Sequence, residues 1–231
     1  MSRVGDAEGS GATGMPWPAI GEPGMLSANR RILLWLLVAV ALLPVYPVAD
    51  VIGTITHLRV GDTDDAMRLV AVRDLVAGQG WFDNIQHRFG PPGGIASHWS
   101  RLVDAPLAAS ERAFAVLAGP RLAEGLTAAL WPMLLFGVFA AILFRAILPR
   151  FGGTAAIPAI VLAAQSYGVT IQFTAGRVDH HNLQILAVLG VALCLIERGR
   201  AAAALGGCLA ALSLAIGLEG APTLALLGGL L

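Results

Sequence analysis

Residues Leu126–Leu148 read LTAALWPMLLFGVFAAILFRAIL, and this stretch decides the fold class of the chain. Its only charge, Arg145, lies near one end. Because about 20 apolar residues suffice for a helix to cross a bilayer, the stretch predicts a membrane-spanning helix. The whole chain agrees, since 56% of its 231 residues are hydrophobic and only 13% are charged, against about 25% charged in soluble domains. We therefore expect an all-α, polytopic membrane helical bundle.

Apolar runs on both sides of this stretch predict further spans. We expect them at Ile32–Val48, Thr154–Phe173, Leu183–Ile196 and Ala201–Leu218, and a sixth begins near Ala221. Arginines gather at alternate ends of these runs, at Arg30, Arg31, Arg145, Arg150, Arg198 and Arg200. Positive charges favour the cytoplasmic side of a membrane, so the pattern predicts a multi-pass protein with a cytoplasmic N-terminus.

The segments outside the spans complete the predicted organisation. Residues 1–30 are rich in Gly, Pro and small polar residues, which predicts a disordered cytoplasmic tail before a transmembrane domain at 31–231. A long extracytoplasmic loop is expected at about 50–121, with interfacial helices at 64–77 and 106–117. The final run 223–231 is too short to cross a bilayer, so we expect a chain that is incomplete at its C-terminus. A net charge of zero gives no electrostatic case for nucleic acid as a partner.

The first cluster of candidate site residues opens the long loop and reads Gly61-Asp62-Thr63-Asp64-Asp65. Three carboxylates within four positions repel one another, and a divalent cation would relieve that repulsion. Oxygen ligands suit Mg²⁺ or Mn²⁺. The alternative is a solvated loop in which an Asp caps the following helix.

The second cluster lies in the expected outer turn between two spans and reads Arg177-Val178-Asp179-His180-His181-Asn182. In an extended stretch Asp179 and His181 point the same way and suit one metal ion. The alternative is a polar turn at the level of the lipid headgroups. Charged groups are costly to keep at a membrane, and the predicted topology places both clusters on the same side. We therefore expect them to converge.

This arrangement resembles the GT-C superfamily of polyprenyl-phosphate-dependent glycosyltransferases. The resemblance rests on one span, an outer loop with Asp64-Asp65 before an amphipathic helix, and the Asp179-x-His181 turn. It covers roughly Ile32 to Glu219 and is closest to the N-terminal transmembrane part of the oligosaccharyltransferase catalytic subunit. It implies that Asp65, or Asp64, orients or deprotonates the acceptor. It also implies that Asp65, Asp179 and His181 bind Mn²⁺ or Mg²⁺.

The implied activity is transfer of a sugar from a polyprenyl-phosphate or polyprenyl-pyrophosphate donor to an extracytoplasmic acceptor. The resemblance implies a bacterial inner (plasma) membrane location, a periplasmic active site, and lipid as a partner. The acceptor stays open, because the family's Trp-Trp-Asp acceptor-peptide motif and later-loop glutamate are absent. Candidate substrate-binding residues are Arg177, His98, Arg101 and His180, since arginine forks suit phosphate oxygens. Each of them also suits a plain role at the membrane interface.

Three other interpretations compete with this one. A transporter or flippase predicts charges inside the spans and glycine-broken half-helices, and neither is evident in the sequence. A non-catalytic membrane scaffold predicts that Asp65 and Asp179 are dispensable. A polymerase or ligase of the O-antigen type relies on Arg and His without a required metal. Trp81, Phe82 and Trp99 suit either stacking on a sugar or anchoring of the loop at the headgroups, and we expect anchoring.

Overall fold

The computed structural model describes residues 45–90, 92–197 and 199–229. Within this part of the chain the fold is mostly helical, with one two-stranded hairpin in the loop between α3 and α4, so the all-α prediction is confirmed. The predicted tail 1–30 and nearly all of the predicted span Ile32–Val48 lie outside the described residues.

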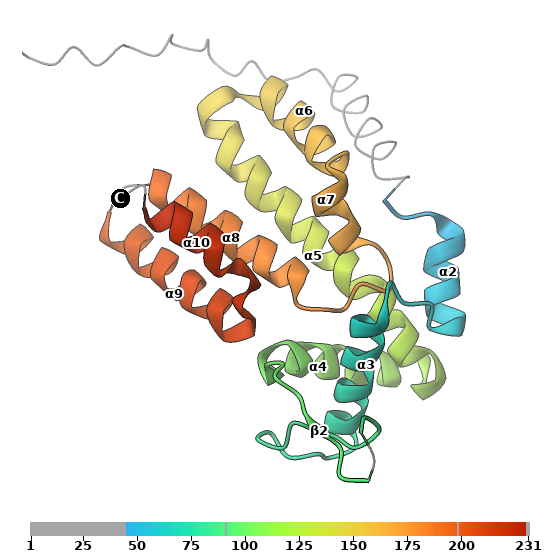
Figure 1. The fold of residues 1–231 in the computed structure, drawn as a ribbon. Coiled ribbons are helices and arrows are strands. Elements are labelled where there is room, and N and C mark those ends of the chain that lie inside the picture. The colour runs from blue at the N-terminus through green and yellow to red at the C-terminus, as the bar shows by residue number, and fades with distance from the viewer. Residues whose placement is uncertain (1–44, 91, 198, 230–231) are drawn as a thin grey trace, which may run out of the picture.

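The helices and strands follow one another in a simple order (Figure 1). The α-helices are α2 (Val48–His57), α3 (Thr63–Val76), α4 (Arg101–Ala118), α5 (Pro120–Phe151), α6 (Gly153–Ala164), α7 (Tyr167–Thr170), α8 (His181–Ile196), α9 (Arg200–Ile216) and α10 (Ala221–Gly228). The 3-10 helices are η1 (Ile171–Phe173) and η2 (Leu218–Gly220). Strands β1 (Ile85–Gln86) and β2 (Ile95–Ala96) pair antiparallel.

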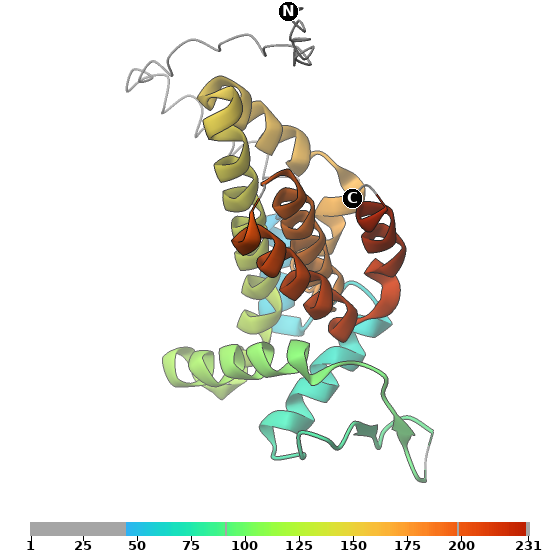
Figure 2. The same ribbon diagram turned by 90° about the vertical axis from the view of Figure 1, so that its left-hand side faces the viewer.

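Helix α5 is the central helix of the fold. It has 32 residues and packs against α2, α4, α6 and α8. Figure 2 shows α4 crossing one end of α5, with α3 and the hairpin beyond it. Pro132 lies inside α5 and has no N–H for the carbonyl of Ala128 one turn earlier. The amide of Gly176 donates to that carbonyl instead, at 3.0 Å, so the proline fixes where the later turn docks.

Apolar length decides which helices can cross a membrane. Among the described residues, α5 is the one unbroken helix long and apolar enough to do so. The helices Ala155–Ala164 and Tyr167–Phe173 form a second candidate only if they count together, because they are bent by 68° at a short break. Helices α8 and α9 are apolar but have 16 and 17 residues. The segment Thr154–Phe173, which the sequence predicts as one span, is therefore interrupted between α6 and α7.

The loop helices begin where short polar side chains cap them. The Asp62 carboxylate accepts from the amides of Asp64 (2.9 Å) and Asp65 (3.2 Å) and starts α3 at Thr63. Ser100 caps α4 in the same way, so this helix starts at Arg101 and not at Pro106 as predicted. Such caps satisfy amides that lack a partner in the first turn.

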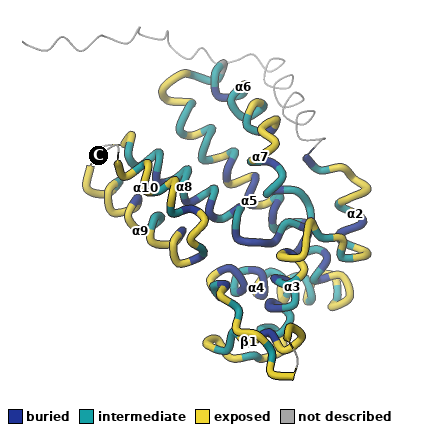
Figure 3. Tube along the Cα trace, in the orientation of Figure 1, coloured by how far each residue is buried: buried dark blue, intermediate teal, exposed yellow. Residues whose placement is uncertain are grey.

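The loop helices are held by a buried cluster that reaches the later turn. Leu69 and Val72 of α3, Val103 and Leu107 of α4, and Val178 belong to this cluster. A second cluster joins Phe136 and Phe139 of α5 to Phe173. Figure 3 shows burial concentrated along α3, α4 and the middle of α5, whereas much of α9 is exposed. The loop is thus a packed cap on α5 that carries the first acidic cluster to the second.

Candidate functional site

The two acidic clusters meet where the first turn of α3 touches the turn before α8. Asp65 is fully buried, and its Oδ1 accepts from the amides of Val178 (2.8 Å) and Asp179 (3.0 Å). Its Oδ2 accepts from Arg177 at 2.9 Å. The structure thus brings together two segments more than one hundred residues apart in sequence, as expected.

Arg177, in the turn, makes further contacts that join it to the first loop. Its guanidinium also pairs with Asp62 and donates to Oε1 of Gln172 at 2.9 Å. The backbone leaves no spare room here, because a Cβ on Gly61 would lie 2.5 Å from Cδ of Arg177. Arg177 therefore ties the first loop to the turn, and its predicted contact with substrate phosphate would require one of these partners to be exchanged.

The turn itself places three titratable side chains side by side. Oδ1 of Asp179 lies 2.6 Å from Nδ1 of His180, and Oδ2 lies 3.4 Å from Nε2 of His181. Burial raises the pKa of Asp179, but the hydrogen bond and charge of His180, together with Arg68, hold it well below its ordinary value. Asp179 is therefore ionised, and its Oδ1 is already engaged.

Arg68 is a site residue that the sequence interpretation missed. Its side chain is completely buried and pairs with Asp104 (2.9 Å) and Asp179 (3.1 Å). Its guanidinium also lies 4.4 Å from the ring centre of Trp99, a favourable cation–π distance. Helical spacing could have indicated it, because Arg68 shares the buried face of α3 with Asp65, Leu69 and Val72.

Two predicted substrate-binding residues do not contact Asp65 or Asp179 directly; Arg101 is linked to Arg68 through Asp104. The buried Arg101 donates to Asp104, to the carbonyl of Ala71 and to Gln79, which gives it a packing role. This position offers no support for a phosphate contact. His98 is exposed and its ring meets the Trp99 ring edge-on, 5.9 Å between centres.

Two expectations for the loop need correction or refinement. Trp99 is not at the surface as a headgroup anchor, because it is buried against Arg68. Phe82 and Trp81 are 95% and 45% exposed, which leaves their anchoring role a prediction. Asp64 is exposed on the first turn of α3, and its predicted catalytic role also stays a prediction.

The turn groups three side chains that could hold a metal ion. Asp179, His180 and His181 each offer a ligand atom, and these atoms lie within 4.8 Å of one another. Because Nδ1 of His180 is taken by Asp179, Oδ2 of Asp179 and Nε2 of His181 are the better pair. Mg²⁺ prefers oxygen ligands, so the imidazole favours Mn²⁺ of the two predicted ions. Asp65 is outside this group, and both of its oxygens already accept hydrogen bonds.

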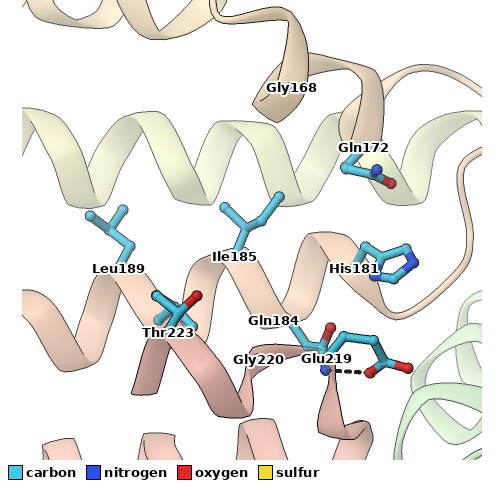
Figure 4. Close-up of a pocket in the computed structure, with 10 residues that line it drawn as sticks. Gly168, Gln172, His181, Gln184, Ile185, Leu189, Glu219, Gly220 and Thr223 are labelled. Carbon is cyan, nitrogen blue, oxygen red and sulfur yellow. Dashed lines mark hydrogen bonds between the residues drawn. The ribbon is translucent and has the colours of Figure 1, made fainter. Parts of the chain in front are cut away.

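A cavity of about 440 Å³ opens beside the turn. Gln172, His181, Gln184 and Glu219 give it a polar end, and Ile185, Val188 and Leu189 line it farther along α8. Figure 4 shows His181 and Gln172 toward one end of the cavity and Leu189 toward the other. The lining thus changes from polar to apolar along one helix.

No family model, curated protein or solved structure matches this chain. The resemblance to the GT-C superfamily therefore stays a prediction that rests on the residues themselves.

Proposed function

We propose that this chain is a GT-C type glycosyltransferase that moves a sugar from a polyprenyl-linked donor to an extracytoplasmic acceptor with the help of a divalent metal. The observation that carries the proposal is the contact between Asp65 and the Asp179 turn. The sequence predicts that both clusters contribute to one metal site, and the two clusters are in contact in the fold.

The exposed surface of the helices supports a polytopic membrane protein. Large apolar side chains face outward along α5, α6, α8 and α9, among them Leu134, Val138, Leu162, Ile196, Leu205, Leu212 and Leu214, which are 40–71% exposed. Helix α9 buries only Gly206, Ser213 and Ile216. Exposed apolar area on this scale needs a covering, and lipid supplies one for every helix at once.

The ends of the helices support the proposed orientation. Arg150, at the end of α5, pairs with Glu197, which follows α8. This ion pair marks the end of α8 away from the Asp179 turn. Positive charge is favoured on the cytoplasmic side, so the candidate site belongs on the periplasmic side of an inner membrane.

The cavity supports a lipid-linked donor. A phosphate ester of a long isoprenoid has a polar head and an apolar tail. The lining changes in the same sense, from His181 and Gln172 to Val188 and Leu189. Because a carboxylate such as Glu219 repels phosphate, the phosphate belongs near the metal ligands, with the hydrocarbon along α8.

The residues of the chain take distinct parts in the proposed reaction. Asp179 and His181 would hold the metal, which when bound neutralises charge on the leaving phosphate. Burial raises the pKa of Asp65 to about 6, against the opposing effect of Arg177. A carboxyl group with such a pKa exchanges protons near neutral pH, but an acceptor would reach the buried Asp65 only by displacing one of the donors to its oxygens.

The decisive experiment measures donor turnover by the whole chain in lipid nanodiscs. A radiolabelled pool of polyprenyl-phosphate- and pyrophosphate-linked sugars is offered with EDTA, and again after Mn²⁺ is restored. We expect turnover with Mn²⁺, loss of at least tenfold in Asp179→Asn, and no change in the matched control Glu197→Gln at the opposite end of α8. Turnover that ignores both EDTA and Asp179→Asn would contradict the metal site and favour a metal-free polymerase or ligase.

One observation favours transport as a second candidate function. The break between α6 and α7 makes a bent helix pair, and Gly168 and Gln172 after the break line the cavity. Discontinuous helices commonly form the binding sites of transporters. Movement of a labelled polyprenyl-linked sugar across liposomes that hold the chain, without turnover, would support a flippase.

A further inference from the structure

The sequence Gly217-Leu218-Glu219-Gly220 forms a turn that the proposed function does not yet use. It contains η2, which lies between α9 and α10 and packs beside the first turn of α8. Oε2 of Glu219 lies 3.1 Å from Nε2 of Gln184 and 3.2 Å from Nε2 of His180. Sequence alone favours a solvated span terminus for this glutamate, yet its carboxylate is directed at two side chains of the candidate site.

The backbone is built to keep Glu219 in this position. Gln184, which is buried, also donates from Nε2 to the carbonyl of Gly217 at 2.9 Å. A Cβ at position 217 would lie 2.2 Å from Oε2 of Glu219 and 3.0 Å from Nε2 of both Gln184 and His180. Only glycine leaves room for the carboxylate to fold back over its own turn.

His180 connects this carboxylate to the metal ligands. Nε2 of His180 makes a charge contact with Oε2 of Glu219 at 3.2 Å without hydrogen-bond geometry, and Nδ1 lies 2.6 Å from Oδ1 of Asp179. Arg68 holds the same oxygen from the opposite segment at 3.1 Å. With Oδ1 fixed in this way, Oδ2 of Asp179 is left toward Nε2 of His181.

We propose that Glu219 is a positioning residue of the metal site, which holds the His180 ring so that Asp179 presents Oδ2 to the ion. The inference rests on the metal site of the proposed function. Partners that orient a ligand from outside the coordination shell typically contribute about 10–100-fold to metal affinity or activity. Glu219 is half-exposed, so the effect is transmitted through the buried His180.

The test measures Mn²⁺ affinity of the whole chain in nanodiscs by EPR titration, which needs no knowledge of the sugar or the acceptor. We expect Glu219→Gln, which keeps the shape and removes the charge, to weaken Mn²⁺ binding about tenfold or more. The metal-free unfolding midpoint should stay near that of the wild type. Glu197→Gln is the matched control and should bind as the wild type does.

A second variant guards against a folding defect. Gln184→Met removes the other partner of Glu219, and we expect a smaller loss of Mn²⁺ affinity in the same direction. If the wild type binds Mn²⁺ and both variants bind equally well, the positioning role is overturned while the metal site stands. If the wild type fails to bind Mn²⁺, or if Asp179→Asn binds it as tightly as the wild type does, the metal site and the positioning role fall together.

Discussion

The cap formed by α3, α4 and the turn before α8 differs from the α8–α9 helix pair in which side chains it buries. In the cap, Asp65, Arg68, Asp104, Asp179 and His180 are each at most 3% exposed. In the helix pair, leucines at 205 and 212 are 55% and 43% exposed. Charges lie inside one region and apolar side chains lie outside the other.

This difference shows that the two regions are stabilised in different ways. Each buried charge of the cap is matched by opposite charge or by amides, because an unpaired buried ion is very unfavourable. In the membrane location that we propose, α8 and α9 would gain little from apolar burial against each other and would rely on small residues for close approach. Gly190 and Gly206, in contact with Leu209 and Cys194 of the facing helices, fit that pattern.

The largest effect is expected from Arg68→Met in the cap. This change leaves Asp104 and Asp179 buried without their shared cation. We expect a loss of about 3–5 kcal/mol in the free energy of unfolding, measured by denaturant titration in mixed micelles. Arg112→Met is the control, because Arg112 is exposed and reaches only one carbonyl at 3.5 Å; it should stay within about 0.5 kcal/mol. Equal losses of unfolding free energy in the two variants would show that the buried ion pairs of Arg68 do not stabilise the cap.

The next effect tests whether close packing of helices extends beyond the α8–α9 pair, to the contact between α2 and α5. A Cβ on Gly125 would lie 2.2 Å from the backbone oxygen of Ile55, so Gly125→Ala forces α2 away from α5. We expect a cost of about 1–3 kcal/mol in the free energy of unfolding, measured in the same micelles.

Gly137 of the same helix serves as the matched control, because a Cβ there meets nothing within 4 Å. Gly137→Ala should stabilise α5 by up to about 1 kcal/mol, since alanine loses less backbone entropy. If both glycine variants behaved alike, the close approach of α2 to α5 would be refuted.

The smallest effect concerns pH. Burial lowers the pKa of His180, but the hydrogen bond and charge of Asp179 outweigh it, so the pKa is raised above 6.5. A raised pKa means that the folded state holds the proton more tightly. The resulting stability is fully present below pH 6.5 and is lost as pH rises through the folded-state pKa.

Unfolding midpoints from pH 6.5 to 9 in EDTA measure this loss. The slope from one group cannot exceed about 1.4 kcal/mol per pH unit. We expect His180→Gln to flatten the wild-type slope, whereas the exposed His87→Gln should leave it as it is. An unchanged slope in His180→Gln would show that the Asp179–His180 pair does not form.

Local signals explain the elements that the sequence predicted well. The fourth predicted span, Leu183–Ile196, ends where α8 ends, and Ala201–Leu218 overlaps nearly all of α9. Both segments have polar or glycine boundaries that can be read from neighbouring residues. The predicted helix at 64–77 differs from α3 by one residue at each end, because Asp62 supplies the cap.

The features that sequence reasoning missed depend on distant partners. Arg68 acts through residues 36 and 111 positions away, and Trp99 is buried because Arg68 stands over it. The proposed role of Glu219 depends on its contacts with His180 and Gln184. The selection of Asp179 and His181 was possible because their pairing is local. The sequence could not decide whether Asp65 binds a metal ion or accepts hydrogen bonds from the later turn. That depends on which atoms face its two oxygens.

The carbonyl of Ala128 has a consequence for how the chain assembles during synthesis. Pro132 deprives it of its helical donor, and Gly176, which supplies the replacement, emerges from the ribosome only after α5 and α6 are complete. An unpaired carbonyl in a hydrocarbon environment is unfavourable. The carbonyl of Ala128 therefore lacks the Gly176 donor until the later turn has been made. Docking of that turn supplies the donor and also brings Asp179 to Asp65. Assembly of the site is in this way coupled to docking of the turn on α5.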